Sequence, residues 1–403
     1  MPVLVNIRSL AACRDEGGQD AIHPIPQASM AWRGTDIAWV GPAAHLPDEY
    51  RSEERIDAKG GLVVPGLIDC HTHLAFAGWR ADEIEARIRG RTYLDIATEG
   101  GGIVRTVAAT RLAGSESLID RCAHWLGGAA RLAVTTVEAK TGYGLDRDTE
   151  VRLLDVYEAL RHTQPVRLVS TLLAAHVVPP EYQRRREQYV EMVCSDLIPA
   201  VARRGLARFC DVFVEESAFT AGEARTILLR AREHGLGAKL HADQFTDGGG
   251  AALAAELGAV SADHLECVST AGVARLASAR TVAVTLPLAS LYLGRPAAPA
   301  RSLIAAGVRV AVATDFNPGT APTFHLPLAM LLAATMLRMT PAEVLKAVTL
   351  HAAQAIGEAS NLGSLEPGKR ADFAIIDAPD VSHWIYHFAP DSCVATYIGG
   401  VRV

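Results

Sequence analysis

The chain has 403 residues, of which 49% are hydrophobic and 21% charged, and its formal net charge is −6. This balance is that of an ordinary globular protein, long enough for two domains or for one barrel with an appendage. We expect no nucleic-acid partner, because no basic stripe is present to neutralise phosphates. We expect no membrane partner either, because no run of about 18 apolar residues is found.

The cysteines and the N-terminal residues indicate the cellular compartment of the protein. Seven cysteines are scattered along the chain without a C-x-x-C pair, and their odd number argues against a disulfide framework. The N-terminus lacks the basic start and the long apolar middle of a signal peptide. We therefore expect a cytoplasmic protein.

Both ends of the chain contain short strand-like segments. They lie at 3–7, 31–41, 371–376, 394–398 and 401–403. Turn residues such as Gly399-Gly400 separate them, and neither end is long enough to bury a core alone. We predict that residues 1–65 and 361–403 together form one small β-sandwich domain.

The middle of the chain, residues 66–360, alternates short apolar strands with longer helical stretches. This alternation, with eight strands, favours a parallel (β/α)8 barrel over a doubly wound sheet. In either fold, functional residues lie where strands end and loops begin. The predicted strands are 68–74, 135–139, 166–175, 209–214, 237–241, 260–264, 281–286 and 308–314, and the main helices 117–132, 148–161, 182–202, 221–233 and 248–257.

A histidine pair lies on the first predicted barrel strand. His71 and His73 are two residues apart, so on an extended strand both imidazoles point to the same face. Two convergent neutral imidazoles are the start of a metal site. The pair alone is weak, and the rest of the chain has to supply further ligands.

Further polar residues end the later strands. They are His176, His241, His264 and Asp315. Burying imidazoles and a carboxylate together is costly unless a cation pairs with them. We predict that His71, His73, His241 and Asp315 bind one metal ion, which activates water for hydrolysis. His264 then accepts or orients a proton beside that water, and Asp315 takes the proton.

These residues resemble a known family. The opening Pro65-Gly66-Leu-Ile-Asp69-x-His71-x-His73, the later histidines, Asp315 and the closing Gly363-Ser-Leu-Glu-Pro-Gly-Lys-x-Ala-Asp-Phe373 are similar to the amidohydrolase superfamily over residues 3–403. The resemblance implies a metal-dependent (β/α)8 barrel with a β-sandwich from both termini. It also implies a bound zinc or iron ion, divalent or trivalent, and a homodimer.

A second set of motifs resembles one branch of that superfamily more closely. This branch opens the ring of 4-imidazolone-5-propanoate, by hydrolysis of the cyclic amide C–N bond, to N-formimidoyl-L-glutamate in histidine degradation. The matching pieces are Phe76-Ala-Gly-Trp-Arg80, Gly100-Gly-Gly-Ile103, Glu138-Ala-Lys-Thr-Gly-Tyr143-Gly-Leu145, Ala174-Ala-His176-Val-Val-Pro-Pro-Glu-Tyr182, His241-Ala-Asp-Gln244-Phe245, Thr314-Asp315-Phe-Asn317-Pro-Gly319-Thr320 and Tyr386-His-Phe388.

The candidate substrate contacts suit an acidic substrate. Arg80 offers a planar, bidentate clamp for the propionate, and Tyr143 can donate a hydrogen bond to the same end. His176 can bond the ring carbonyl and stabilise charge on its oxygen. The loop after the metal aspartate can contact the ring nitrogen or the tail through Asn317, Gly319 and Thr320.

Two positions need separate interpretation. Many superfamily members carry a proton-shuttling glutamate three residues after the strand-five histidine, where this chain has Gln244, which has no titratable proton. Gln244 can only orient substrate, so acid–base work rests on Asp315 and His264. Lys140 resembles in position the carbamylated lysines of two-metal relatives, but no spare histidine pair accompanies it, which favours one metal.

Two other readings remain open. A deaminase of the same superfamily, acting on a guanine-like or cytosine-like ring, would use the same metal ligands; Arg80 and Tyr143 favour the acidic substrate over a neutral base. A metal-free barrel serving as a scaffold is the alternative from another class, and the presence of all four ligands argues against it.

Overall fold

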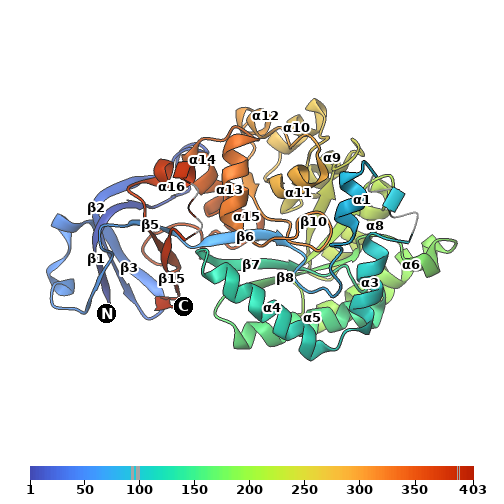
Figure 1. Cartoon of the computed structure of the whole chain (residues 1–403), viewed down its shortest axis with the longest axis horizontal. Coiled ribbons are helices and arrows are strands. Elements are labelled where there is room, and N and C mark those ends of the chain that lie inside the picture. Colours follow the sequence, from blue (N-terminus) through green and yellow to red (C-terminus); the bar gives the residue numbers. More distant parts are fainter. Residues whose placement is uncertain (92–94, 97–99, 388, 390) are drawn as a thin grey trace.

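The computed structural model describes residues 1–91, 95–96, 100–387, 389 and 391–403. Phe388, the last residue of the motif Tyr386-His-Phe388, lies outside these residues. Two eight-stranded sheets organise the chain, one a barrel wrapped by helices and the other a separate sheet that carries both termini (Figure 1). Among the helices described, none has the length and apolarity needed to cross a membrane.

The barrel sheet has eight strands in chain order, and every pairing along it is parallel. Its two edges meet where Asp315 N–H donates to the His71 carbonyl at 3.0 Å and His73 N–H donates to the Phe316 carbonyl at 2.9 Å. The predicted barrel is confirmed. Its strands are β6 (Leu67–Thr72), β7 (Val134–Lys140), β8 (Arg167–Ala175), β9 (Phe209–Val214), β10 (Gly237–Ala242), β11 (Ser261–His264), β12 (Val282–Thr285) and β13 (Val310–Val312).

Helices cover the outside of the barrel (Figure 1). In α8 a capping box joins Thr220 and Glu223, and apolar residues three and four apart face the strands. The described helices are α1 (Glu83–Ile88), α3 (Ile103–Leu112), α4 (Ser115–Ala130), α5 (Arg147–Thr163), α6 (Arg186–Met192), α7 (Ile198–Arg203), α8 (Ala221–Glu233), α9 (Gly250–Leu257), α10 (Thr270–Ala277), α11 (Pro287–Leu293), α12 (Ala300–Ala305), α13 (Leu326–Thr335), α14 (Pro341–Ala347), α15 (Leu350–Ala355) and α16 (Val381–His387).

Most elements differ from their predicted bounds by a few residues; the strand predicted over 68–74 ends at Thr72, so His73 follows it, and two further differences have a clear physical cause. The helix predicted over 182–202 is interrupted by a π-helical turn at Val193–Leu197, because Pro199 cannot donate a backbone hydrogen bond to the preceding turn. Strand β13 ends earlier than predicted. The Thr314 N–H leaves the strand ladder and donates instead to the Asp69 carboxylate at 3.0 Å.

The terminal sheet joins the two ends of the chain. Its order is β16-β15-β14-β5-β1-β2-β3, with β4 beside β1, so both chain ends meet where β5 pairs with β14. The predicted β unit built from both termini is confirmed. Its strands are β1 (Val3–Ala11), β2 (Pro24–Arg33), β3 (Asp36–Pro42), β4 (Arg55–Asp57), β5 (Leu62–Pro65), β14 (Phe373–Ile376), β15 (Cys393–Ile398) and β16 (Val401–Arg402).

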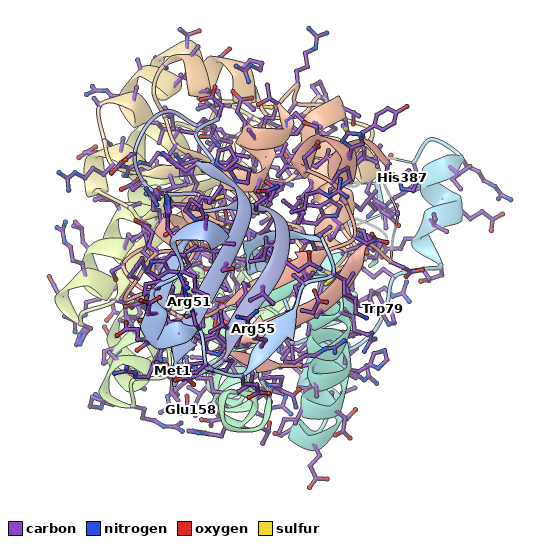
Figure 2. The ribbon with its side chains drawn as sticks, turned by 90° about the vertical axis from the view of Figure 1, so that its left-hand side faces the viewer. Met1, Arg51, Arg55, Trp79, Glu158 and His387 are labelled. Atoms are coloured by element: carbon purple, nitrogen blue, oxygen red, sulfur yellow. The ribbon has the colours of Figure 1, made fainter. Side chains whose placement is uncertain are left out.

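This sheet folds over a core of its own. The rings of Trp32 on β2 and Phe373 on β14 have centroids 5.3 Å apart, although β5 and β1 lie between these strands in the sheet. Such a contact requires the sheet to curl onto itself. Figure 2, viewed from this side, has the first strands in front of the barrel, with Met1, Arg51 and Arg55 on the near face.

Gly66 is the single residue between β5, the last N-terminal strand of the terminal sheet, and β6, the first strand of the barrel. Pro65 ends β5 and Leu67 begins β6, with Gly66 between them. A Cβ at position 66 would lie 2.3 Å from Thr135 Oγ1, so a side chain has no room there. The strand that carries His71 therefore begins one residue after the terminal sheet.

Candidate active site

The predicted ligands converge at the carboxyl ends of the barrel strands. His71 comes from β6, His73 from the residue after its end, His241 from β10, and Asp315 from the segment after β13. The Nε2 atoms of His73 and His241 are 3.4 Å apart. Asp315 Oδ1 lies 3.5 Å from His71 Nε2 and 3.4 Å from His73 Nε2. All four side chains are buried, and the closed barrel brings them together from distant positions.

The donor set fits a metal ion. Two groups of three residues place their ligand atoms within 4.8 Å of one another: His71, His73 and Asp315, and His71, His241 and His264. His71 Nε2 is buried and has no hydrogen-bond partner among the described residues. A buried, unsatisfied imidazole nitrogen facing a carboxylate and further imidazoles is what a divalent cation satisfies.

The protonation states of Asp315, His73 and His241 agree with this, whereas His71 must release a proton when a metal binds. Burial would raise the pKa of Asp315, but the adjacent imidazoles of His71 and His73 outweigh burial and hold this pKa well below its usual range. Burial lowers the pKa of His241 to about 3 and also lowers that of His73. Burial likewise acts to lower the pKa of His71, but Asp263 and Asp315 raise it to about 8. An ionised carboxylate and neutral imidazoles are the forms that ligate metals.

Two carboxylates behind the histidines were not identified from the sequence. Asp263 Oδ2 lies 2.6 Å from His71 Nδ1, and Asp211 Oδ1 lies 3.1 Å from His241 Nδ1. Each carboxylate accepts the Nδ1 proton and leaves Nε2 as the free ligand atom. The sequence feature that could have identified them is a carboxylate within an otherwise apolar strand, as in Phe209-Cys-Asp211-Val-Phe-Val214.

Lys140 lies in the barrel interior beneath the histidines. Its Nζ is 2.7 Å from Asp211 Oδ2 and 3.0 Å from Glu138 Oε1. The lysine is thus paired as an ammonium ion with carboxylates. Binding of one metal ion, without a carbamylated bridge, stays a prediction.

Two residues of the site have unusual backbone conformations. The φ angles of His264 and Asp315 are 81° and 56°, in the left-handed region that few residues other than glycine adopt. Such conformations persist where surrounding contacts enforce them, and they gather at functional sites. His264 Nδ1 lies 3.5 Å from Glu266 Oε1, a carboxylate that was not identified from the sequence.

The loop after Asp315 is shaped by Asn317. Its side-chain oxygen accepts the N–H groups of Gly319 and Thr320, both at 2.7 Å, and its nitrogen donates to the Asp315 carbonyl at 2.6 Å. Thr320 Oγ1 lies 3.5 Å from Asp315 Oδ2. The Asn317 amide is therefore engaged in holding the loop, whereas Thr320 lies beside the candidate metal ligand.

Arg80 reaches the same loop. Its side chain is 6% exposed and its guanidinium lies against Gly319, with Nε 3.9 Å from Glu83 Oε2. An aromatic cluster supports the segment that carries Arg80: the Phe76 and Trp125 rings stack with centroids 4.7 Å apart. Two predicted substrate contacts, Arg80 and Gly319, are thereby brought together.

His176 and Tyr143 form one wall of the site. The His176 ring stacks on His73, with centroids 5.0 Å apart, and the Tyr143 ring is 5.6 Å from His176. His176 Nδ1 lies 3.1 Å from the Gly142 carbonyl, and burial holds the pKa of His176 well below its usual value. A neutral His176 donates through Nδ1 to Gly142 and presents Nε2 as an acceptor. It can donate to a substrate oxygen only when protonated.

Gln244 lies at the end of β10, beyond the ligand His241. Its side chain is 7% exposed. The neighbouring Asp243 accepts the N–H groups of Gly250 and Ala251 at 2.9 and 3.0 Å, which fixes the start of α9. The strand end that carries Gln244 is therefore anchored next to the metal ligands.

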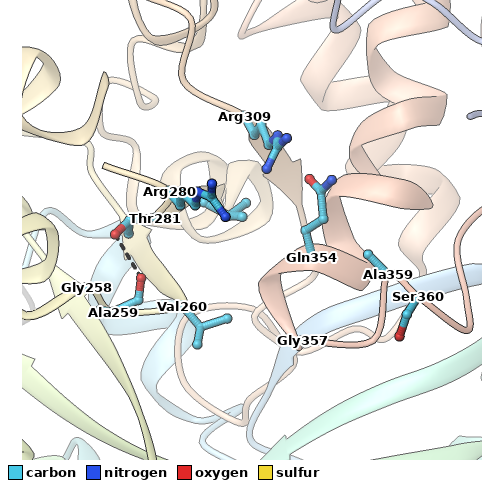
Figure 3. Close-up of a pocket in the computed structure, with 11 residues that line it drawn as sticks. Gly258, Ala259, Val260, Arg280, Thr281, Arg309, Gln354, Gly357, Ala359 and Ser360 are labelled. Atoms are coloured by element: carbon cyan, nitrogen blue, oxygen red, sulfur yellow. Dashed lines mark hydrogen bonds between the residues drawn. The ribbon is translucent and has the colours of Figure 1, made fainter. Parts of the chain in front are cut away.

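A recess at the opposite end of the barrel is distinct from this site. It has a volume of about 410 Å³ and lies at the amino ends of β11, β12 and β13. Arg280, Arg309 and Gln354 face it (Figure 3). None of the predicted site residues lines it, and barrel enzymes carry out chemistry at the carboxyl ends of their strands.

Comparison with known proteins supports a family assignment. The amidohydrolase family model matches residues 62–403. The imidazolonepropionase of Geobacillus thermodenitrificans is 48% identical, covering 91% of this chain and 88% of that protein. That of Solibacter usitatus is 45% identical, covering 93% and 90%.

Solved structures agree in fold. The atrazine chlorohydrolase TrzN from Arthrobacter aurescens TC1, complexed with zinc, superposes with a TM-score of 0.74 at 16% identity, covering 100% of this chain and 95% of that one. At 16% identity this similarity supports only a shared fold. The sequence relatives go further: the chain belongs to the amidohydrolase family and, within it, to the imidazolonepropionases.

Proposed function

We propose that the protein hydrolyses 4-imidazolone-5-propanoate to N-formimidoyl-L-glutamate in cytoplasmic histidine degradation. The observation that carries the proposal is the position of Arg80, whose buried guanidinium lies against Gly319 in the loop that follows Asp315. An anionic propionate is the natural partner of such a guanidinium. The curated relatives with this activity in their names support the same substrate.

We propose His71, His73, His241 and Asp315 as the ligands of one zinc or iron ion. When bound, the ion supplies Lewis-acid chemistry that activates water and polarises the ring carbonyl. Imidazole and carboxylate ligands suit both metals. Elemental analysis of the purified protein decides between them.

The proposed substrate contacts lie around Arg80. The guanidinium binds the propionate in a bidentate manner, and Tyr143 donates a hydrogen bond to the same end. Gly319 and Thr320 line the substrate where the loop passes Arg80, and Asn317 acts by holding that loop. Gln244 orients the ring through its amide.

The proposed proton transfers involve Asp315 and His264. Water adds to the ring carbonyl carbon while Asp315 accepts its proton, and His264, beside Glu266, orients that water. The C–N bond then breaks as the ring nitrogen receives the proton. The carbonyl carbon becomes the new carboxylate, and the nitrogen leaves as part of the formimidoyl group. His176 contacts the ring and stabilises charge on the carbonyl oxygen when its Nε2 carries a proton.

The test is turnover by the purified, metal-loaded protein. We expect loss of the imidazolone absorbance and formation of N-formimidoylglutamate, detected by mass spectrometry, with chelator-treated protein as the control. Turnover of guanine or cytosine without turnover of the imidazolone would establish the deaminase alternative. Analytical ultracentrifugation tests the homodimer that we propose from the family resemblance.

A further inference from the structure

A closed network of charges fills the barrel interior beneath the metal ligands. Its members are fully buried: Glu138 and Lys140 on β7, Asp211 on β9, Lys239 on β10 and Asp263 on β11. Three carboxylates and two ammonium groups make up this network. Charges without access to water are costly unless each has a partner at short distance.

Lys140 is the member that joins the two histidine-binding carboxylates. Its Nζ lies 2.7 Å from Asp211 Oδ2 and 3.3 Å from Asp263 Oδ2. Asp211 in turn accepts from His241 Nδ1, and Asp263 from His71 Nδ1. One ammonium group thus contacts both carboxylates that bind His71 and His241, two of the four proposed metal ligands.

Lys239 has the same burial but different partners. Its Nζ lies 2.5 Å from Glu138 Oε2, and it lies over the Phe209 ring at 5.5 Å. Within the described residues, Glu138 is the carboxylate at ion-pair distance from Lys239. Removal of either lysine changes the network charge by one unit, but only Lys140 contacts Asp211 and Asp263.

We propose that Lys140 is a positioning residue for the metal. Its ammonium group holds the Asp211 and Asp263 carboxylates side by side, so that each accepts a hydrogen bond from a histidine Nδ1 and directs the Nε2 of that histidine to the metal. Without this cation, two like charges would face each other in the interior. The inference rests on the proposed metal ligands and is independent of the substrate.

The test compares metal affinity in two matched variants of the full chain. Zn²⁺ is titrated into metal-free protein in competition with a chromophoric chelator, for the wild type, Lys140→Met and Lys239→Met. Loss of groups that hold metal-binding histidines costs roughly 10- to 100-fold in metal affinity. We expect a loss of that size in Lys140→Met and a loss of less than about threefold in Lys239→Met. Equal losses in both variants, or wild-type affinity in Lys140→Met, overturn the proposal.

Two further measurements keep the test independent of folding and of activity. In metal-free wild-type protein at a pH above the His71 pKa of about 8, ¹⁵N NMR of labelled histidines is expected to show His71 and His241 with the proton on Nδ1, and in Lys140→Met a mixture of tautomers. If Lys140→Met does not fold, Asp263→Asn replaces it, since this variant removes one link and leaves Lys140 paired with Asp211 and Glu138. Wild-type zinc affinity in Asp263→Asn overturns the proposal. Failure of imidazolone turnover with normal zinc binding would count against the proposed substrate alone.

Discussion

Arg80 occupies the space that a side chain at position 319 would fill. A Cβ built on Gly319 would lie 1.0 Å from Arg80 Nη2 and 2.2 Å from Cζ. The guanidinium is the far end of a flexible side chain, so a larger residue at 319 displaces it without disturbing the backbone. The glycine after the metal aspartate and the arginine after the histidine pair therefore act as one unit.

Gly319→Ala is expected to weaken substrate binding. Displacing the guanidinium removes a charge-assisted pair of hydrogen bonds, which contributes about 1.5–3 kcal/mol, so we expect KM for 4-imidazolone-5-propanoate to rise roughly 10- to 100-fold. The change in kcat should be smaller. Steady-state kinetics measures both. Gly114→Ala is the control, because a Cβ at Gly114 meets open space; an unchanged KM in Gly319→Ala would contradict the clamp.

The variants His264→Asn and Asp315→Asn distinguish between the two candidate sets of metal ligands. One set is His71, His73, His241 and Asp315, and the other is His71, His241 and His264. If His71, His73, His241 and Asp315 hold the metal, His264→Asn retains it, and kcat falls by about 10²- to 10⁴-fold through loss of proton transfer. Asp315→Asn is expected to lose the metal. Elemental analysis after gel filtration measures the metal content of both variants. Metal loss in His264→Asn with retention in Asp315→Asn would assign the ion to His71, His241 and His264 instead.

His351 is expected to make the protein less stable in acid. Burial lowers its pKa from 6.5 to about 4, and its Nδ1 lies 3.2 Å from the Val310 carbonyl. A base whose pKa is lower in the folded state contributes stability above pH 6.5, and this contribution is lost as the pH falls towards 4. Between pH 6.5 and 4.5 the loss is about 2–3 kcal/mol. The measurement is urea unfolding of metal-free protein against His351→Asn, which should not show this loss; parallel curves for the two proteins would refute the assignment.

Trp32→Ala is expected to destabilise the terminal sheet. Trp32 is 1% exposed and packs on Phe373 and Tyr397 from the other end of the chain. Large-to-small changes of a buried tryptophan cost about 3–5 kcal/mol. Denaturant unfolding measures the loss. Trp39→Ala, at a partly exposed position of the same sheet, should cost less, and a similar cost for both would argue against a shared core.

The sequence alone was sufficient to predict the barrel strands and the polar residues at their ends. The alternation of apolar strands with helices predicted the barrel, and the β10 and β11 histidines were placed correctly because polar residues stand out after apolar runs. Asp211 and Asp263 were missed for the opposite reason. They lie within apolar strands, and only closure of the barrel shows that they face histidines from other strands.

The orientation of individual side chains was also beyond the sequence. Asn317 was predicted as a substrate contact, yet its amide is engaged by the loop that carries Gly319 and Thr320. The tautomer of His176 likewise depends on the Gly142 carbonyl, contributed by a different strand end. Such roles depend on distances between segments far apart in the chain.

The pairing of β5 with β14 has a consequence for the order of folding. Residues 66–372 separate the two strands, so the first strands are synthesised long before their partners. Until β14 emerges, the edge of β5 has unpaired backbone groups next to the glycine that leads into the histidine strand. The whole barrel segment is therefore synthesised while three of the eight strands of the terminal sheet, β14, β15 and β16, are still missing, and residues near the C-terminus complete the core over Trp32.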